Sequence, residues 1–143
     1  MNFKRSCAFM LMITSLFMWN CNRDAQPDEN SDSHLFKDLS PTDAWQFIQQ
    51  HANDANFKLI DVRTPGEYAS GHITGATNLD YYAPGFRDSL NALDKTKTIM
   101  IYCRSGNRSG RTVNMMETME FTKVYHIENG LIGWQRDNLP LEQ

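Results

Sequence analysis

A short stretch at residues 102–110, YCRSGNRSG, gathers side chains that can perform chemistry. It contains Cys103, the arginines Arg104 and Arg108, and Gly106 between them. A thiolate is a strong nucleophile, and a cysteine at a helix N-terminus or beside basic side chains has a pKa lowered from about 8.5 to roughly 3.5–7.5. The stretch therefore predicts a nucleophilic cysteine in a site that attracts anions.

The segments on either side predict how this cysteine is positioned. Residues 97–102, KTIMIY, have the apolar character of a strand, and residues 109–119 have helical spacing. The turn between them brings Cys103 close to the first N–H groups of the helix, which have no partners within it. Gly106 lets the backbone bend there without a steric penalty. Such a turn can direct several N–H donors at one sulfur atom or anion.

The rest of the domain alternates strand and helix signals. Ser40 and Pro41 are typical of a helix start, as the N-cap and the first helical residue. The other predicted segments are strands at 57–62 and 124–127, a turn or short helix at 65–67, a loop or short strand at 73–79, and helical pieces at 86–93 and 131–136. This alternation predicts an α/β domain with a mainly parallel sheet. Ligands bind such sheets at the carboxyl ends of the strands, where Cys103 lies.

The N-terminus predicts export. Lys4 and Arg5 precede an apolar run at 7–19, which is shorter than the roughly 20 residues of a membrane-spanning helix. A charged start followed by such a run is typical of an export signal. The predicted organisation is therefore an export signal at 1–20, a polar linker at 21–33 and one domain at 34–143.

Cys21 follows the apolar run and resembles the acylated cysteine of bacterial lipoproteins. That resemblance implies cleavage before Cys21, a lipid anchor on it, and a location on the periplasmic side of a bacterial membrane. An uncleaved N-terminal anchor and simple secretion are the alternatives. If Cys7 leaves with the signal and Cys21 carries lipid, Cys103 is the only free thiol of the mature chain, and a lone cysteine in an exported protein suggests a reactive thiol. The net charge of −3 becomes more negative on cleavage, which disfavours nucleic acid as a partner.

Three motifs resemble the single-domain rhodanese family of sulfurtransferases. They are LIDVRTPGEYASGHITGATNLD at 59–80, YCRSGNRS at 102–109 and ENGLIGW at 128–134, in which Asn129 stands in place of a glycine. The resemblance implies a rhodanese-like fold, with helices on both faces of a mainly parallel central sheet. It also implies chemistry that needs neither a metal nor an organic cofactor.

The resemblance further implies a mechanism and its residues. The Cys103 thiolate takes the outer sulfur of a small sulfur-containing anion such as thiosulfate and becomes a persulfide. A thiol, cyanide or a protein then accepts that sulfur, which makes the reaction a ping-pong covalent transfer. The implied substrate-binding residues act mainly through the backbone N–H groups of the loop, and they are Arg104, Ser105, Gly106, Asn107, Arg108 and Ser109.

Two other functions remain open. The domain could be a persulfide carrier or sensor that hands its sulfur to a partner without turnover. It could also be a cysteine phosphatase or an arsenate reductase, but those families have five residues between the cysteine and the arginine. Four residues separate Cys103 from Arg108, and the shorter loop favours one sulfur atom over a tetrahedral oxyanion.

The first motif also carries side chains that we expect to support the structure. Asp61 follows a strand and is expected to anchor the loop backbone. Arg63 and Glu67 have the spacing of an ion pair, and His72 is expected to satisfy a local hydrogen bond. The remaining histidines show no pattern that predicts a role; they are His34, His51 and His126.

Overall fold

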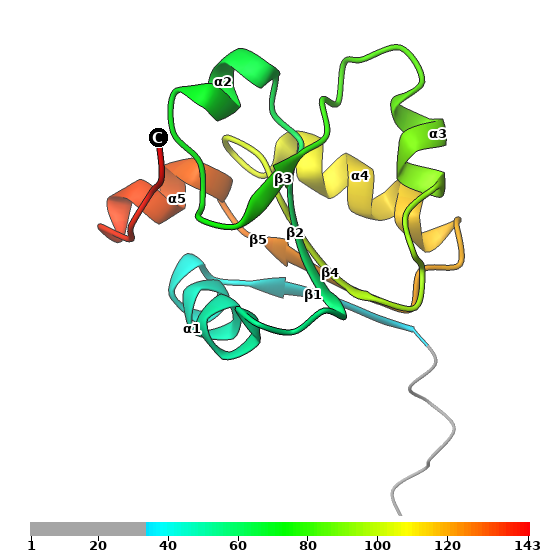
Figure 1. The fold of residues 1–143 in the computed structure, drawn as a ribbon, viewed down its shortest axis with the longest axis horizontal. Helices are drawn as coiled ribbons and strands as arrows, with labels where there is room; N and C mark the ends of the chain where they lie inside the picture. Colours follow the sequence, from blue (N-terminus) through cyan, green and yellow to red (C-terminus); the bar gives the residue numbers. More distant parts are fainter. Residues whose placement is uncertain (1–33) are drawn as a thin grey trace, which may run out of the picture.

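The computed structural model describes residues 34–143, in which five parallel strands form a central sheet (Figure 1). The strands are β1 (Leu35–Leu39), β2 (Phe57–Asp61), β3 (Ala76–Asn78), β4 (Thr98–Tyr102) and β5 (Lys123–Ile127). Their order across the sheet is β1-β5-β4-β2-β3, and every neighbouring pair is parallel. The predicted α/β class is confirmed. The predicted export signal, Cys21 and the linker lie outside the described residues.

Helices cover both faces of this sheet, as predicted. They are α1 (Pro41–His51), α2 (Pro65–Ala69), α3 (Phe86–Asn91), α4 (Asn107–Glu117) and α5 (Gly130–Arg136). The apolar core on one face includes residues of α3 and α4, and the core on the other face includes residues of α1 and α5. Figure 1 shows α3 and α4 together, apart from α1 and α5. Within residues 34–143, no helix is long and apolar enough to cross a membrane.

Strand β4 is the middle strand, and both of its faces are buried. Ile99 and Ile101 pack into the core beside α3 and α4, whereas Met100 and Tyr102 pack into the core beside α1 and α5. Burying one such side chain contributes about 1.5–3 kcal/mol to the stability of the fold. Strand β4 is therefore a rigid support for the segment that begins at Cys103. The alternation continues into Cys103, which belongs to the core on the α4 face.

Local sequence signals explain where the helices begin. The Ser40 hydroxyl accepts a hydrogen bond from the backbone N–H of Asp43 at 3.1 Å, and Pro41 is the first residue of α1, which confirms the predicted start. Helix α4 begins at Asn107, earlier than predicted, because Gly106 caps it with a φ of 90°. The patterns do not predict β1, whose pairing with β5 adds a strand at the sheet edge.

Candidate active site

The loop after β4 wraps around the sulfur of Cys103. The backbone N–H of Gly106 donates to Sγ at 3.2 Å, and the hydroxyl of Ser109 donates to it at 3.3 Å. Gly106 can close this turn because its φ lies in the left-handed region that other residues rarely adopt. Cys103 is only 1% exposed, so the sulfur lies at the bottom of the loop.

The electrostatics of the loop favour a thiolate. Burial opposes ionisation of Cys103, but the Ser109 hydroxyl and the backbone N–H groups of Ser109, Ser105 and Gly106 outweigh it and lower the pKa of the thiol. Hydrogen bonds to the charged form are one of the few causes that can lower an acidic pKa against burial. The arrangement can therefore hold a nucleophilic sulfur anion without a separate base in direct contact.

The turn between β5 and α5 holds the loop from the other side. The N–H groups of Leu131 and Ile132 donate to the carbonyl oxygens of Cys103 and Arg104, at 2.8 and 2.9 Å. Gly130 has no side chain because a Cβ there would overlap the carbonyl oxygen of Cys103. With their carbonyl oxygens bonded to α5, Cys103 and Arg104 keep a fixed backbone orientation at the start of the loop.

A second contact ties the loop to α2. Both terminal nitrogens of Arg108 donate to the Glu67 carboxylate, each at 2.8 Å, and the guanidinium lies 5.6 Å from the ring centre of the exposed Tyr82. The hydrogen bond from Arg108 is the largest cause that lowers the pKa of Glu67 to about 2, and Thr64 adds to it. Burial opposes this shift and does not cancel it. Much of the positive charge of Arg108 is thus balanced within the protein.

The predicted ion pair between Arg63 and Glu67 is wrong. Arg63 instead pairs with Asp61, with Nη2 to Oδ2 at 2.7 Å, and it also donates to the carbonyl oxygen of Gly71. Burial works against the charge of Arg63, but the hydrogen bonds and the negative charge of Asp61 outweigh it and raise its pKa. The Asp61 carboxylate also accepts the backbone N–H of Arg63, which confirms its predicted contact with the loop backbone.

The other predicted loop residues lie on the outside. The residues Arg104, Ser105 and Asn107 are exposed. The side of the loop at Arg104 borders a shallow pocket that Glu67, Ile132 and Gln135 help to line. His72 makes the expected local hydrogen bond, through Nδ1 to the carbonyl oxygen of Tyr68.

The structure adds His126 to the site, although no sequence pattern predicted a role for it. His126, near the carboxyl end of β5, lies with Nε2 2.8 Å from the hydroxyl of Ser109 and Nδ1 2.9 Å from Asp38 of β1. The available signal was its place at the carboxyl end of a strand that neighbours β4 in the sheet. Strand order depends on long-range pairing, which no local pattern contains.

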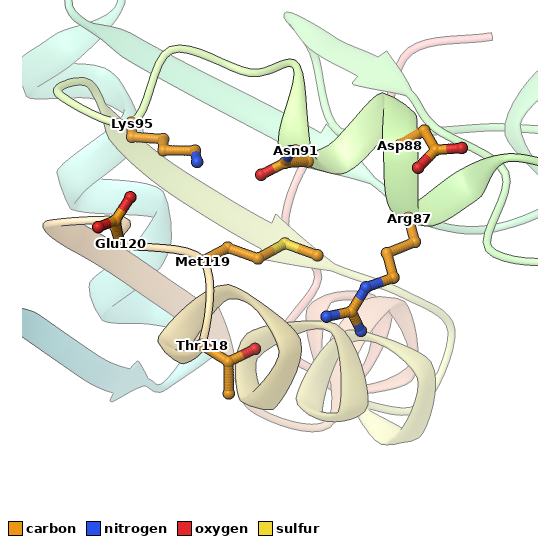
Figure 2. Close-up of a pocket in the computed structure, with 7 residues that line it drawn as sticks. All are labelled: Arg87, Asp88, Asn91, Lys95, Thr118, Met119 and Glu120. Carbon is orange, nitrogen blue, oxygen red and sulfur yellow. The ribbon is translucent and has the colours of Figure 1, made fainter.

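A separate pocket lies between α3 and the end of α4 (Figure 2). Side chains of both charges line it, with Arg87 and Lys95 opposed by Asp88 and Glu120. None of its lining residues belongs to the loop at 103–109, so this pocket is not part of the sulfur site.

An α/β domain with a buried cysteine sulfur inside an N–H-lined loop is built to stabilise a sulfur anion. Residues 41–137 match the Rhodanese-like domain family, and the chain belongs to this family. A protein named sulfurtransferase from Allochromatium vinosum is 31% identical over 103 residues, which cover 72% of this chain and 94% of the relative. The thiosulfate sulfurtransferase GlpE of Actinobacillus pleuropneumoniae is 29% identical over 110 residues, covering 77% and 96%.

The solved structures agree on the fold. A rhodanese-related protein from Thermoplasma volcanium superposes with a TM-score of 0.63 at 22% identity, covering 74% of this chain and 97% of that one. The relatives together support a rhodanese-type sulfurtransferase.

Proposed function

We propose that this protein transfers a sulfane sulfur from a small anionic donor such as thiosulfate to a thiophilic acceptor, through a persulfide on Cys103. The observation that carries the proposal is the sulfur of Cys103 itself, which receives the N–H of Gly106 and the hydroxyl of Ser109 at the start of α4. The name of the thiosulfate sulfurtransferase relative supports the choice of donor.

Each half-reaction is a displacement at sulfur. The Cys103 thiolate attacks the outer sulfur of thiosulfate, the sulfur–sulfur bond of the donor breaks, and sulfite leaves with the electron pair. The loop N–H groups stabilise the terminal sulfur anion of the persulfide, because preorganised donors act strongly in a site that excludes water. An acceptor such as cyanide or a thiolate then attacks the terminal sulfur, and the Cys103 thiolate leaves.

Arg108, Glu67, Arg104 and the backbone N–H groups of the loop make or break no covalent bond in this mechanism. The pairing of Arg108 with Glu67 holds the loop, so we assign donor attraction mainly to the backbone N–H groups and to the exposed Arg104. The short separation between Cys103 and Arg108 continues to favour sulfur over a phosphate ester or arsenate.

The test uses the full chain and follows the peptide that contains Cys103. Incubation with thiosulfate should add one sulfur, about 32 Da, to this peptide, and cyanide should remove it as thiocyanate with repeated turnover. The Cys103→Ser variant is the matched control and should gain nothing. A gain without turnover would indicate a persulfide carrier instead, and no gain would contradict the proposal and direct attention to phosphate esters and arsenate.

We also propose export and lipid attachment at Cys21, on the basis of the signal-like residues 1–20. Two acyl chains would anchor the protein stably, since each buried CH₂ contributes about 0.8 kcal/mol. Mass analysis of protein extracted from bacterial membranes should find a chain that starts at an acylated Cys21. A chain that starts at Cys21 without acyl mass would contradict lipid attachment.

A further inference from the structure

A chain of hydrogen bonds runs from the buried sulfur to the surface. It passes from Cys103 Sγ to the Ser109 hydroxyl (3.3 Å), then to His126 Nε2 (2.8 Å), and from His126 Nδ1 to Asp38 Oδ1 (2.9 Å). Ser109 is fully buried, the side chain of His126 is 13% exposed, and that of Asp38 is 62% exposed. The chain therefore connects a shielded sulfur to solvent through groups that can each carry a proton.

The fold brings these residues together from distant segments. The parallel register of β1 and β5 pairs Asp38 with His126, and both belong to the strand positions that face α4. The neighbouring Tyr125 packs on the opposite face, beside α1. The imidazole lies against the first turn of α4, where a Cβ at Gly106 would stand 3.7 Å from Nε2 and one at Gly110 would stand 3.8 Å from Cε1.

The Ser109 hydroxyl has one proton and three acceptors within reach. These are the carbonyl oxygen of Gly106 at 3.1 Å, the sulfur of Cys103, and Nε2 of His126, which is the nearest. The ionised Asp38 carboxylate can only accept, so it keeps the proton of the neutral imidazole on Nδ1 and leaves a lone pair on Nε2. The neutral ring therefore takes the Ser109 hydrogen bond, whereas a protonated ring donates to Ser109 and frees its hydroxyl proton for the sulfur.

We propose that Ser109, His126 and Asp38 form a proton relay that ionises the Cys103 thiol and stabilises the resulting thiolate. The S–H bond breaks and its proton binds the Ser109 oxygen, while the original Ser109 proton moves to Nε2 of His126. The sulfur keeps the electron pair, and Asp38 balances the imidazolium. The reverse movement returns the proton, so no other reactant is needed. His126 and Asp38 are positioning residues, since they act on the sulfur through Ser109.

This relay deepens the proposed sulfur transfer and depends on it for its catalytic meaning. Asp38 contacts the imidazole from β1, and Cys103 at the end of β4 is connected to it through Ser109 of α4. On α4, the charge of Arg108 is paired with Glu67. An imidazolium and a thiolate stabilise each other, so the two groups should titrate as a coupled pair.

The first test measures the rate at which iodoacetamide alkylates Cys103 in the full chain as a function of pH. Mass spectrometry of the peptide containing Cys103 excludes the signal of the other cysteines. The wild-type rate should rise in two steps, one for each member of the coupled pair. His126→Phe keeps a ring in the same space but has no nitrogen, so its rate should rise in a single step. The matched control His51→Phe, on α1, should keep both steps.

Variants of the middle residue separate a relay from a simple donor. Ser109→Ala should abolish the second step and lower the alkylation rate at pH 7 several-fold, because it disconnects His126 and also removes a hydrogen bond to the sulfur. Ser109→Thr retains a hydroxyl and should restore both steps. If Ser109→Ala changes the profile while that of His126→Phe superimposes on the wild type, Ser109 is only a donor to the sulfur and the relay is overturned.

A second measurement does not need the His126 and Ser109 variants, so it remains valid if one of them fails to fold. Nitrogen-15 NMR of the full chain should find neutral His126 protonated at Nδ1. The midpoint of its titration should shift to lower pH in Cys103→Ser, because the thiolate that stabilises the imidazolium is gone. An identical titration in both proteins would overturn the relay. Neither experiment uses a sulfur donor, so failure of the relay and failure of sulfur transfer are distinguished.

Discussion

Two arginine–carboxylate pairs lie close to the active-site loop, and they differ in almost every physical respect. Asp61 and Arg63 are two residues apart at the end of β2 and are both buried. Glu67 and Arg108 are 41 residues apart, and their side chains are 32% and 15% exposed. The first pair shapes the segment in which it lies, whereas the second joins two segments.

The difference teaches what each pair can contribute. Both side chains of the Asp61–Arg63 pair are buried, so each charge depends mainly on the other and on the hydrogen bond from Arg63 to Gly71. Removing one partner of a buried pair leaves an uncompensated charge and is strongly destabilising. The Glu67–Arg108 pair can exchange its hydrogen bonds with water. We therefore expect the first pair to control folding and the second to control the geometry of the loop.

The largest expected effect, and the strongest test of this comparison, is the loss of stability in Arg63→Met. The variant leaves the Asp61 carboxylate buried without its partner, so it should lose about 3–5 kcal/mol of unfolding free energy. Urea denaturation measures the loss. Arg136→Met is the matched control, because Arg136 pairs with Asp137 at the exposed end of α5 and its loss should be much smaller. Equal losses in the two variants would show that burial does not distinguish these pairs.

Acid should weaken the second pair. The pKa of Glu67 is about 2 in the folded protein and about 4.5 without its partners. Its contribution to stability is therefore complete above pH 4.5 and is lost as the pH falls towards 2. After a discount for solvent screening, we expect Glu67→Gln to cost about 1–2 kcal/mol at pH 7 and much less at pH 2.5.

Urea denaturation of wild type and Glu67→Gln across pH 2.5–7 checks this pH dependence. Glu117→Gln, at an exposed position of α4, serves as the control for loss of a carboxylate. A difference between wild type and Glu67→Gln that stays constant with pH would rule out the ion pair as its source.

The smallest expected loss of stability comes from the contact between Tyr82 and Arg108 of the second pair. Tyr82 lies over the guanidinium of Arg108, and an exposed contact of this kind contributes about 0.5–1 kcal/mol. Tyr82→Leu should therefore destabilise the protein by no more than about 1 kcal/mol, and only while Arg108 is present. A double-mutant cycle of Tyr82→Leu with Arg108→Gln measures that coupling, and a coupling energy of zero would separate Tyr82 from the pair.

Most predictions of helix and strand positions, which depend on neighbouring residues, were accurate. The start of α1 follows from Ser40 and Pro41, whose preferences act within one turn of helix. The strand–loop–helix around Cys103 likewise follows from its own sequence. The end of the loop was placed two residues late only because Gly106 can cap α4 without a side-chain hydrogen bond.

One prediction from local spacing was wrong, and the features that depend on contacts between distant segments were missed. The spacing of Arg63 and Glu67 forms an ion pair only inside a helix, but Thr64 lies between them as an extended N-cap with ψ of 156°. Arg63 is thus outside α2, and Glu67 is left to reach Arg108. Strand β1 and the role of His126 depend on the pairing of β1 with β5, which only the folded chain creates.

The burial of Cys103 limits which molecules can react with its sulfur. A sulfur that is almost wholly shielded admits slender reagents and excludes large ones, so the unloaded Cys103 thiolate is hindered from exchanging with a disulfide of another protein. In the proposed cycle, the transferred atom adds about 2 Å, the length of a sulfur–sulfur bond, to the reach of the side chain. The terminal persulfide sulfur is then the atom that an acceptor contacts, and Cys103 Sγ stays shielded both when the sulfur is taken up and when it is transferred.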